Sequence, residues 1–197
     1  MYRGDFRLFD SPLEVHLQGL LERVARQLGS ATREELADAQ LQATIDKFRQ
    51  QIPVIQRDEV EFSTRDAGSG VDVTMTVPVE GNERMLTMRP RVARDTRNDV
   101  ISLTGSRRQL WGSDNGSPLA PGFSLTFTVD AATTPAEVKA EARSIIDEID
   151  SVLGLMRPVV ERYHADLEAK VNASAQARLE VLYGAESLSE GLAKGLD

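Results

Sequence analysis

The strongest constraint on the fold is a helical hydrophobic repeat that fills the last third of the chain. Residues 134–137, Thr-Pro-Ala-Glu, form a capping-box pattern with proline at the first helical position. Apolar residues then recur at helical spacing as far as Tyr183. A straight helix of this length would measure about 70 Å, which exceeds the diameter of a domain of this size. We therefore predict a long helix that kinks near Pro158, folds back as a helical hairpin, or projects toward a second subunit.

The first half of this repeat carries a heptad-spaced apolar stripe. Its spacing alternates between four and three residues, as in the seam of a coiled coil. Two interpretations remain open: the stripe packs against the rest of the chain as core, which is the commoner outcome, or it forms an oligomer seam. The residues of this stripe are Val138, Ala142, Ile145, Ile149, Val152 and Met156.

The first 51 residues predict two amphipathic helices. Residues 11–14 and 32–35 each match a capping box, and Gly29 and Pro53 are placed to end the two helices. Each helix has one apolar stripe, so the pair is a helical hairpin that needs a partner surface.

The middle of the chain, residues 54–130, changes to a period of two. The clearest strands are 71–79 and 123–129, and shorter ones are expected near residues 60–62, 85–88 and 100–104, with a loop over 105–122. Pro78 places the end of its strand at a sheet edge or a bulge. The fold class is therefore α+β, with an N-terminal helical hairpin, a curved antiparallel sheet of four to five strands, and the long kinked C-terminal helix or helical hairpin. We predict a division into residues 1–130, the hairpin plus sheet, and residues 131–197, the long helical element packed on it.

Composition excludes several chemistries. The chain of 197 residues has no cysteine, so disulfides, thiolate zinc sites and cysteine nucleophiles are excluded, and a reducing compartment fits. No apolar run approaches the roughly 18 residues of a membrane span. We expect a cytoplasmic protein without a membrane partner. The net charge of −8 argues against bulk attraction to nucleic acid or anionic lipid.

The motif Glu161-Arg-Tyr-His164 resembles half of a di-iron site, because glutamate and histidine at i and i+3 share one helix face. Such a site needs a second Glu-x-x-His, and the only other histidine, His16, does not belong to one. A zinc site that combines both histidines with a carboxylate is the remaining metal hypothesis. A satisfied surface histidine is the favoured interpretation. We therefore predict no metal and no cofactor, with a metal-dependent enzyme as a minor alternative.

Enzymatic action is not expected. The sequence has no Gly-x-Ser-x-Gly elbow, no Walker A motif and no Gly-x-Gly-x-x-Gly after a strand. Two histidines also leave little choice of a general base.

A cluster of arginines is the strongest polar signal. The segment from residue 84 to residue 108 contains seven arginines and only two aspartates. Arginine side chains form paired hydrogen bonds with phosphate and carboxylate groups. The nearby tryptophan could stack on a base. The favoured interpretation is a solvated loop, or one that pairs with Asp147, Glu148 and Asp150. The candidate anion or nucleic-acid site comprises Arg84, Arg89, Arg91, Arg94, Arg97, Arg107, Arg108 and Trp111.

Three stretches resemble the N-terminal region of a family of uncharacterised bacterial proteins. They are "RDEVEF" at 57–62, "VDVTMTVPVEGNERMLTMRP" at 71–90, and "PAEVKAEARSIIDEIDSVLGLMRPVVERYHADLEAKVNASAQARLEVL" from Pro135. In this family a helical segment leads into a small sheet and then a long helical hairpin. Several members continue into a restriction-endonuclease-like domain and look like components of anti-phage defence. This sequence has no nuclease core, so the resemblance does not imply nuclease activity here.

Together these features predict a non-enzymatic sensor, scaffold or oligomerisation module. The resemblance implies that this module belongs to a bacterial defence system. We expect a protein partner or a homo-oligomer. A nucleic-acid or anion-binding module that uses residues 84–108 is the alternative.

Overall fold

The computed structural model describes residues 11–91 and 122–193 in full, and the backbone of residues 107–111. The chain forms two compact units. The first, which we call the sheet unit, comprises Met1–Leu13 and Gln51–Val159. The second, the helical unit, comprises Glu14–Gln50 and Val160–Asp197. The two-part division predicted from sequence, 1–130 and 131–197, stays a prediction.

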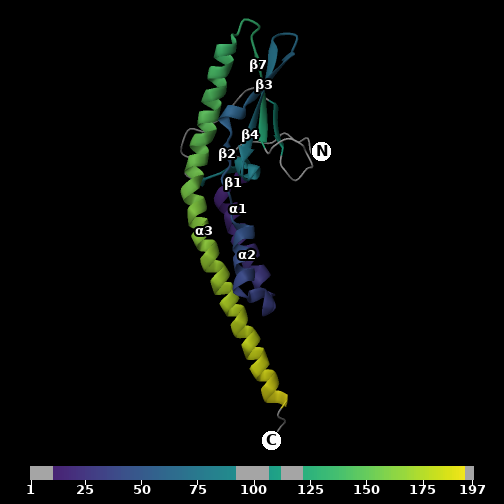
Figure 1. The fold of residues 1–197 in the computed structure, drawn as a ribbon, viewed down its shortest axis with the longest axis vertical. Helices are drawn as coiled ribbons and strands as arrows, with labels where there is room; N and C mark the ends of the chain where they lie inside the picture. Colours follow the sequence, from purple (N-terminus) through teal and green to yellow (C-terminus); the bar gives the residue numbers. More distant parts are fainter. Residues whose placement is uncertain (1–10, 92–106, 112–121, 194–197) are drawn as a thin grey trace. The chain divides into compact units, whose positions relative to one another are not determined.

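The sheet unit contains a five-stranded antiparallel sheet (Figure 1). Four strands follow the order β2-β4-β7-β6, and β3 pairs with β4 on the same side as β2. This confirms the predicted α+β class, and the five strands among the described residues lie within the predicted four to five. The strands are β2 (Val54–Ile55), β3 (Glu61–Asp66), β4 (Val71–Glu80), β6 (Arg107–Trp111) and β7 (Gly122–Val129).

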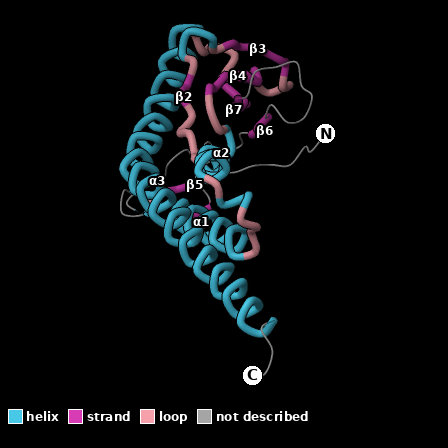
Figure 2. Tube along the Cα trace, turned by 60° about the horizontal axis from the view of Figure 1, so that its bottom comes forward, coloured by secondary structure: helices cyan, strands magenta, loops and turns pink. Residues whose placement is uncertain are grey.

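The helix α3 (Pro135–Ala193) covers one face of this sheet with its first part (Figures 1 and 2). The register pairs Met75 with Leu125 and Val77 with Phe123, which places these four side chains on one face. All four are fully buried. Because apolar and polar residues alternate along β4 and β7, one face of the sheet is apolar. The apolar stripe of α3 covers this face.

The heptad-spaced stripe is mostly core of the single chain. Val138 is half-buried, and the other five members from Ala142 to Met156 are buried. This is the burial expected from the core interpretation. An oligomer seam along the same residues stays a prediction that this burial does not support.

Pro78 lies in a central strand rather than at the edge of the sheet. It pairs with Gly122 of β7, and its carbonyl accepts a hydrogen bond from the backbone N–H of Gln56 (3.0 Å). Between β2 and β3 the chain forms a short 3-10 helix, η2 (Arg57–Glu59). Because N–H and C=O of one strand residue point the same way, the missing N–H of Pro78 faces this interruption. The ladder to β7 is therefore unaffected.

The segment that follows β4 differs from the prediction. Residues 85–88 were expected to form a strand, but most of them belong to the 3-10 helix η3 (Glu83–Thr87). A two-residue strand, β5 (Met88–Arg89), follows and pairs in parallel with β1 (Ser11–Pro12). Strand β6 lies in the stretch expected to be a loop, and the expected strand 100–104 lies outside the described residues.

The helical unit combines α1 (Leu13–Gly29), the 3-10 helix η1 (Glu34–Leu36), α2 (Asp38–Phe48) and the second part of α3. The predicted helical hairpin is confirmed. Its core includes Leu17, Leu20, Val24, Leu28, Leu36, Ile45 and Phe48 from the hairpin, and Val160, Tyr163, Leu167, Val171 and Ala175 from α3.

The capping boxes predicted at residues 32–35 and 134–137 both form. Thr134 and Glu137 exchange hydrogen bonds at the start of α3: the Thr134 N–H donates to Oε2 of Glu137 (2.8 Å), and the Glu137 N–H donates to Oγ1 of Thr134 (3.3 Å). The bond from the Thr134 N–H, and a second one from the Thr134 hydroxyl to the same carboxylate oxygen (2.8 Å), lower the pKa of Glu137. Thr32 and Glu35 exchange equivalent bonds of 2.8 and 3.4 Å, although they lie at the start of η1 rather than of α2.

Helix α3 continues through Pro158 as one helix, so of the predicted alternatives the helical hairpin does not occur. The ring of a helical proline clashes with the carbonyl four residues earlier, and that residue here is Gly154. A glycine can shift its backbone more easily than other residues. Gly154 can therefore move its carbonyl away from the ring of Pro158, and the helix continues. Among the described residues no helix is both long and apolar enough to cross a bilayer.

Candidate interaction surfaces

The structure places the candidate anion-binding arginines in several elements. Arg84 lies in η3, Arg89 in β5 and Arg91 directly after it. Arg107, Arg108 and Trp111 belong to β6, of which only the backbone is described, and Arg94 and Arg97 lie outside the described residues. The anion or nucleic-acid site therefore stays a prediction.

The acidic side of α3 pairs with an arginine that sequence analysis did not single out. Arg57 of η2 binds Asp147 (Nη1–Oδ1 2.7 Å) and donates from Nε to Oδ2 of Asp150 (3.0 Å). Hydrogen bonds to Asp150 and then Asp147 raise the pKa of Arg57. All three side chains are well exposed, so the cluster contributes little stability but holds η2 beside α3.

The Glu161–His164 motif anchors the end of α2. The hydroxyl of Tyr163 donates to the backbone carbonyl of Phe48 (2.8 Å), the last residue of α2. Nε2 of His164 lies 3.1 Å from the carbonyl oxygen and 3.3 Å from the amide nitrogen of Gln50. The last turn of a helix leaves carbonyls without intrahelical partners, and Tyr163 satisfies one of them. The motif thus has a structural role that accounts for both aromatic residues.

Nothing in the described part of the chain resembles a metal site. No group of three or more histidine and acidic side chains is placed to hold an ion among these residues, and Glu161 is exposed. His16 is half-buried on α1, where burial and then the charge of Arg23 lower its pKa. The zinc hypothesis therefore has no geometric support among the described residues.

Replacing Tyr163 with phenylalanine is expected to lower the free energy of unfolding by about 0.5–1.5 kcal/mol, the usual net value of one hydrogen bond. The loss stays moderate because the Phe48 carbonyl also accepts from Nε2 of Gln50 (3.1 Å). Burial raises the pKa of Tyr163 to about 12, from 10.0 in the unfolded chain. The stability contributed by the neutral phenol is therefore complete below pH 10 and declines as the pH rises toward 12.

Urea unfolding at pH 7 and above pH 10 measures both effects. The Tyr163→Phe variant should lose less stability on alkalinisation than the wild type. Tyr183→Phe is the matched control, because the Tyr183 side chain is largely exposed and its effect should stay within about 0.5 kcal/mol. Equal alkaline losses in the wild type and Tyr163→Phe would contradict the assignment.

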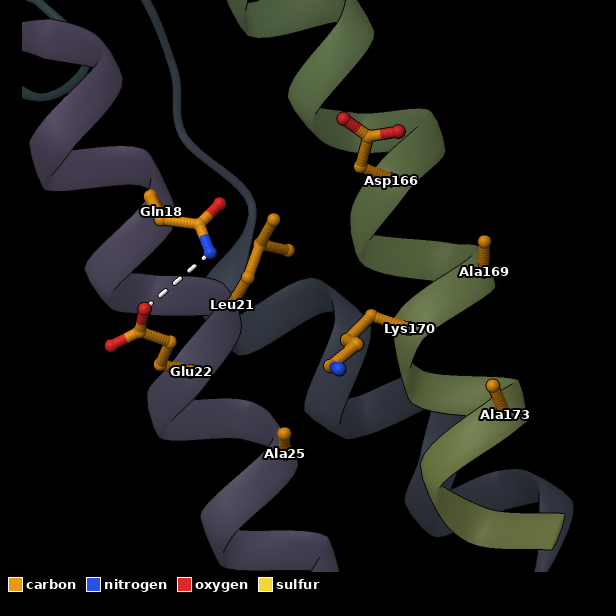
Figure 3. Close-up of a pocket in the computed structure, with 8 residues that line it drawn as sticks. All are labelled: Gln18, Leu21, Glu22, Ala25, Asp166, Ala169, Lys170 and Ala173. Carbon is orange, nitrogen blue, oxygen red and sulfur yellow. Dashed lines mark hydrogen bonds between the residues drawn. The ribbon is translucent and has the colours of Figure 1, made fainter. Parts of the chain in front are cut away.

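A groove of about 540 Å³ lies between α1 and α3 within the helical unit (Figure 3). Its apolar lining consists of Leu21 and three small residues, Ala25, Ala169 and Ala173. Gln18, Glu22, Asp166 and Lys170 form a polar rim, and Gln18 donates to Glu22 (3.4 Å). In Figure 3 the side chains of Leu21 and Lys170 point into the space between the two helices. The small alanines leave room for another helix to approach closely.

The C-terminal part of α3 exposes large apolar side chains. Val181 is 59%, Leu188 65% and Leu192 73% exposed, and every residue from 183 to 193 is exposed. With Ala185 these residues are spaced 4, 3 and 4 apart, the spacing of a coiled-coil seam. We call Val181, Ala185, Leu188 and Leu192 the exposed seam. The opposite side of α3 binds the connection between α1 and α2, because Glu186 pairs with Arg33 (2.8 Å).

A second hollow lies in the sheet unit, where the start of α3 meets η2 and β3. This cleft has a volume of about 320 Å³. Its apolar part comprises Val60, Phe62, Ala142 and Ile146, and its charged part comprises Arg57, Asp58, Lys139 and Arg143. Phe62, in a strand whose six residues are all exposed, is itself 40% exposed. We call this hollow the β3 cleft.

Neither the two hollows nor the exposed seam was predicted from the sequence. The seam residues follow the same helical periodicity as the buried stripe upstream, so only their exposure distinguishes them. Comparisons with protein-family models, curated proteins and solved structures give no match for this chain. The resemblance to bacterial defence proteins therefore stays a prediction.

Proposed function

We propose that the helical unit is a non-enzymatic assembly module that pairs two copies of this chain, with the α3 helices antiparallel. The observation that carries the proposal is the exposed seam: Val181, Leu188 and Leu192 are large apolar side chains with more than half of their surface in water. A helix end whose apolar side chains face water is only marginally stable, so a covering partner would stabilise residues 183–193. A role within bacterial defence rests on the resemblance alone.

The groove and the exposed seam belong to one continuous face of α3. Successive residues along that face are three or four apart, which keeps them on the same side of a helix. They run from the rim of the groove through small residues to the seam: Lys170, Ala173, Ala177, Val181, Gly184, Leu188 and Leu192. An antiparallel partner helix on this face would meet the groove with its seam and offer its own groove in return.

Two-fold symmetry sets the register of this pairing. The centre between groove and seam falls near Ala177, so Ala173 would face Val181 of the second copy, and Lys170 would face Gly184. Ala177 would face its own counterpart, where a small side chain lets the backbones approach. Each copy then buries both its seam and its groove, which makes the interface self-complementary in the manner of closed dimers.

The charges beside the seam permit self-association. The positions that flank it are uncharged: Leu182, Gly184, Ser189 and Gly191. The acidic residues Glu186 and Glu190 lie on the far side of α3, so they would not face their counterparts. Lys170 would lie one turn from Glu180 of the second copy, a favourable pair. An acidic chain can thus pair with itself without like-charge contacts at the seam.

Sedimentation velocity over a range of concentrations tests the pairing. The wild type should show twice the monomer mass, and Leu188→Glu should raise the dimer Kd by at least about tenfold, because burying a carboxylate in place of leucine costs more than 1.4 kcal/mol. Val15→Glu is the matched control, because Val15 is 68% exposed and does not line the groove. A wild type that stays monomeric at high concentration contradicts the proposal.

Single cysteines test the orientation, because the chain has none of its own. Ala177→Cys should form a disulfide-linked dimer under mild oxidation, since the two sulfurs would meet at the symmetry axis. Ala185→Cys should not, because in the antiparallel register its counterpart lies about 24 Å away along the helix. Efficient crosslinking through Ala185→Cys and none through Ala177→Cys would instead indicate parallel seams.

A further inference from the structure

We propose that the outer edge of β3 and the β3 cleft together bind an extended segment of a partner protein. The segment would add to the sheet as a strand and place an apolar side chain, with acidic neighbours, in the cleft. This interaction is separate from assembly through α3, because all of its residues belong to the sheet unit.

The edge of β3 offers backbone hydrogen-bonding groups. Among the described residues β3 pairs only with β4, and the whole strand Glu61–Asp66 is exposed. Alternate residues of such a strand direct their N–H and C=O groups away from the sheet, where a second chain can pair with them. Strand addition of this kind supplies affinity through the main chain and specificity through pockets for alternate side chains.

The β3 cleft lies where such a pocket is needed. Phe62 pairs with Met75, whose side chain belongs to the buried face under α3, so Phe62 lies on that face too. A residue of an added strand opposite Phe62 would have its Cβ about 4.5–5.5 Å away on the same face. Its side chain would therefore enter the cleft between Phe62 and the α3 residues Ala142 and Ile146.

The charges of the cleft select an acidic segment. Its lining holds three cations and one carboxylate, on a chain whose net charge is −8. Arg57 is already paired with Asp147 and Asp150. Lys139 and Arg143, one turn apart on α3, are exposed and form no ion pair with the described residues. Their long side chains can therefore reach carboxylates that flank the apolar side chain on the same face of the added strand.

A protein segment fits these features better than a nucleic acid does. The cleft accepts a single apolar side chain, and the strand edge presents alternating donors and acceptors that match a peptide backbone. Nucleic acid would need a longer track of cations than Lys139 and Arg143, the two cations of the cleft lining that form no ion pair with the described residues. The occupant is accordingly an extended peptide with the pattern acidic-x-apolar-x-acidic.

Fluorescence anisotropy with a labelled synthetic peptide tests the inference on the full chain. The probe is acetyl-TETLTET-amide, whose glutamates and leucine share one face of a strand. A counterpart with lysine in place of glutamate should bind at least tenfold more weakly. The double variant Lys139→Glu/Arg143→Glu should weaken binding of the acidic probe at least tenfold, whereas Arg26→Glu, which removes an exposed cation of α1, should leave it unchanged.

Backbone N-methylation separates strand addition from simple charge attraction. The amides of odd-numbered and even-numbered peptide residues point to opposite sides of an extended strand, so only one of these two sets faces β3. Methylating that set should abolish binding, and methylating the other set should leave binding intact. Equal effects of the two sets, or no saturable binding at millimolar peptide, would overturn the proposal. So would a labelled single-stranded DNA that binds more tightly than the peptide and depends on Lys139 and Arg143. The Leu188→Glu variant should bind the peptide normally, so a failure of assembly and a failure here are distinguishable.

Discussion

Replacing Ile149 with alanine is expected to lower the free energy of unfolding by about 2–5 kcal/mol, the range for truncating a large aliphatic side chain in a core. Ile149 is fully buried on α3, in the part that belongs to the sheet unit. Truncation removes buried apolar surface and leaves a cavity that the surrounding side chains fill only in part. The loss belongs to the single chain, so it should not depend on protein concentration.

Urea unfolding at two protein concentrations well apart measures this loss. Val54→Ala is the matched control in the same unit, since Val54 is 59% exposed and its truncation should change stability by about 0.5 kcal/mol or less. If the stripe from Val138 to Met156 were an oligomer seam, Ile149→Ala would instead shift the midpoint mainly at low concentration. A small effect that changes with concentration would therefore contradict the core interpretation.

Long periodic segments were predictable because their pattern extends over many residues. Strands β4 and β7 alternate apolar and polar residues, and α3 begins at the predicted Pro135. Capping boxes were also readable, because they need only two side chains three residues apart. Thr32 and Glu35 show the limit: the bonds form, yet the helix that follows is a short 3-10 turn.

The errors lie where distant residues decide the local structure. Residues 85–88 have apolar spacing that fits a short strand, but Met85 and Leu86 are buried within a 3-10 helix. Pro78 favours a sheet edge or a bulge locally, and it lies in a central strand at the point where η2 interrupts the neighbouring strands β2 and β3. Neither the burial of Met85 and Leu86 nor the interruption by η2 can be predicted from a short window of sequence.

The candidate surfaces were less predictable than the fold. The exposed seam and the buried stripe of α3 have the same kind of spacing, and only packing separates Leu188, which is exposed, from Ile149, which is not. The β3 cleft joins residues about 80 positions apart, Phe62 and Arg143. No local sequence pattern indicates that these two residues lie close together. Net charge gave no sign of Arg57 either, although its side chain binds Asp147 and Asp150 of α3.

Gly122→Ala is expected to destabilise the sheet unit by about 1–3 kcal/mol, the usual cost of forcing extra atoms into a packed interior. A Cβ at this position would lie 2.5 Å from the carbonyl oxygen of Val77 and 3.1 Å from Cα of Pro78. Both atoms belong to the backbone of β4, so no flexible side chain can move aside. Gly122 faces Pro78 at a pair whose backbone groups point away from each other, where antiparallel strands approach most closely, about 4.5 Å between Cα atoms.

The same substitution at Gly19 should act in the opposite direction, which makes it the control for Gly122→Ala. Gly19 lies in α1, and a Cβ there would meet no atom within 4 Å. Alanine should stabilise the helix by about 0.5–1 kcal/mol, because it loses less backbone entropy on folding than glycine does. Urea unfolding of both variants compares the two signs. A neutral Gly122→Ala would mean that β4 and β7 can separate locally to accommodate the added Cβ.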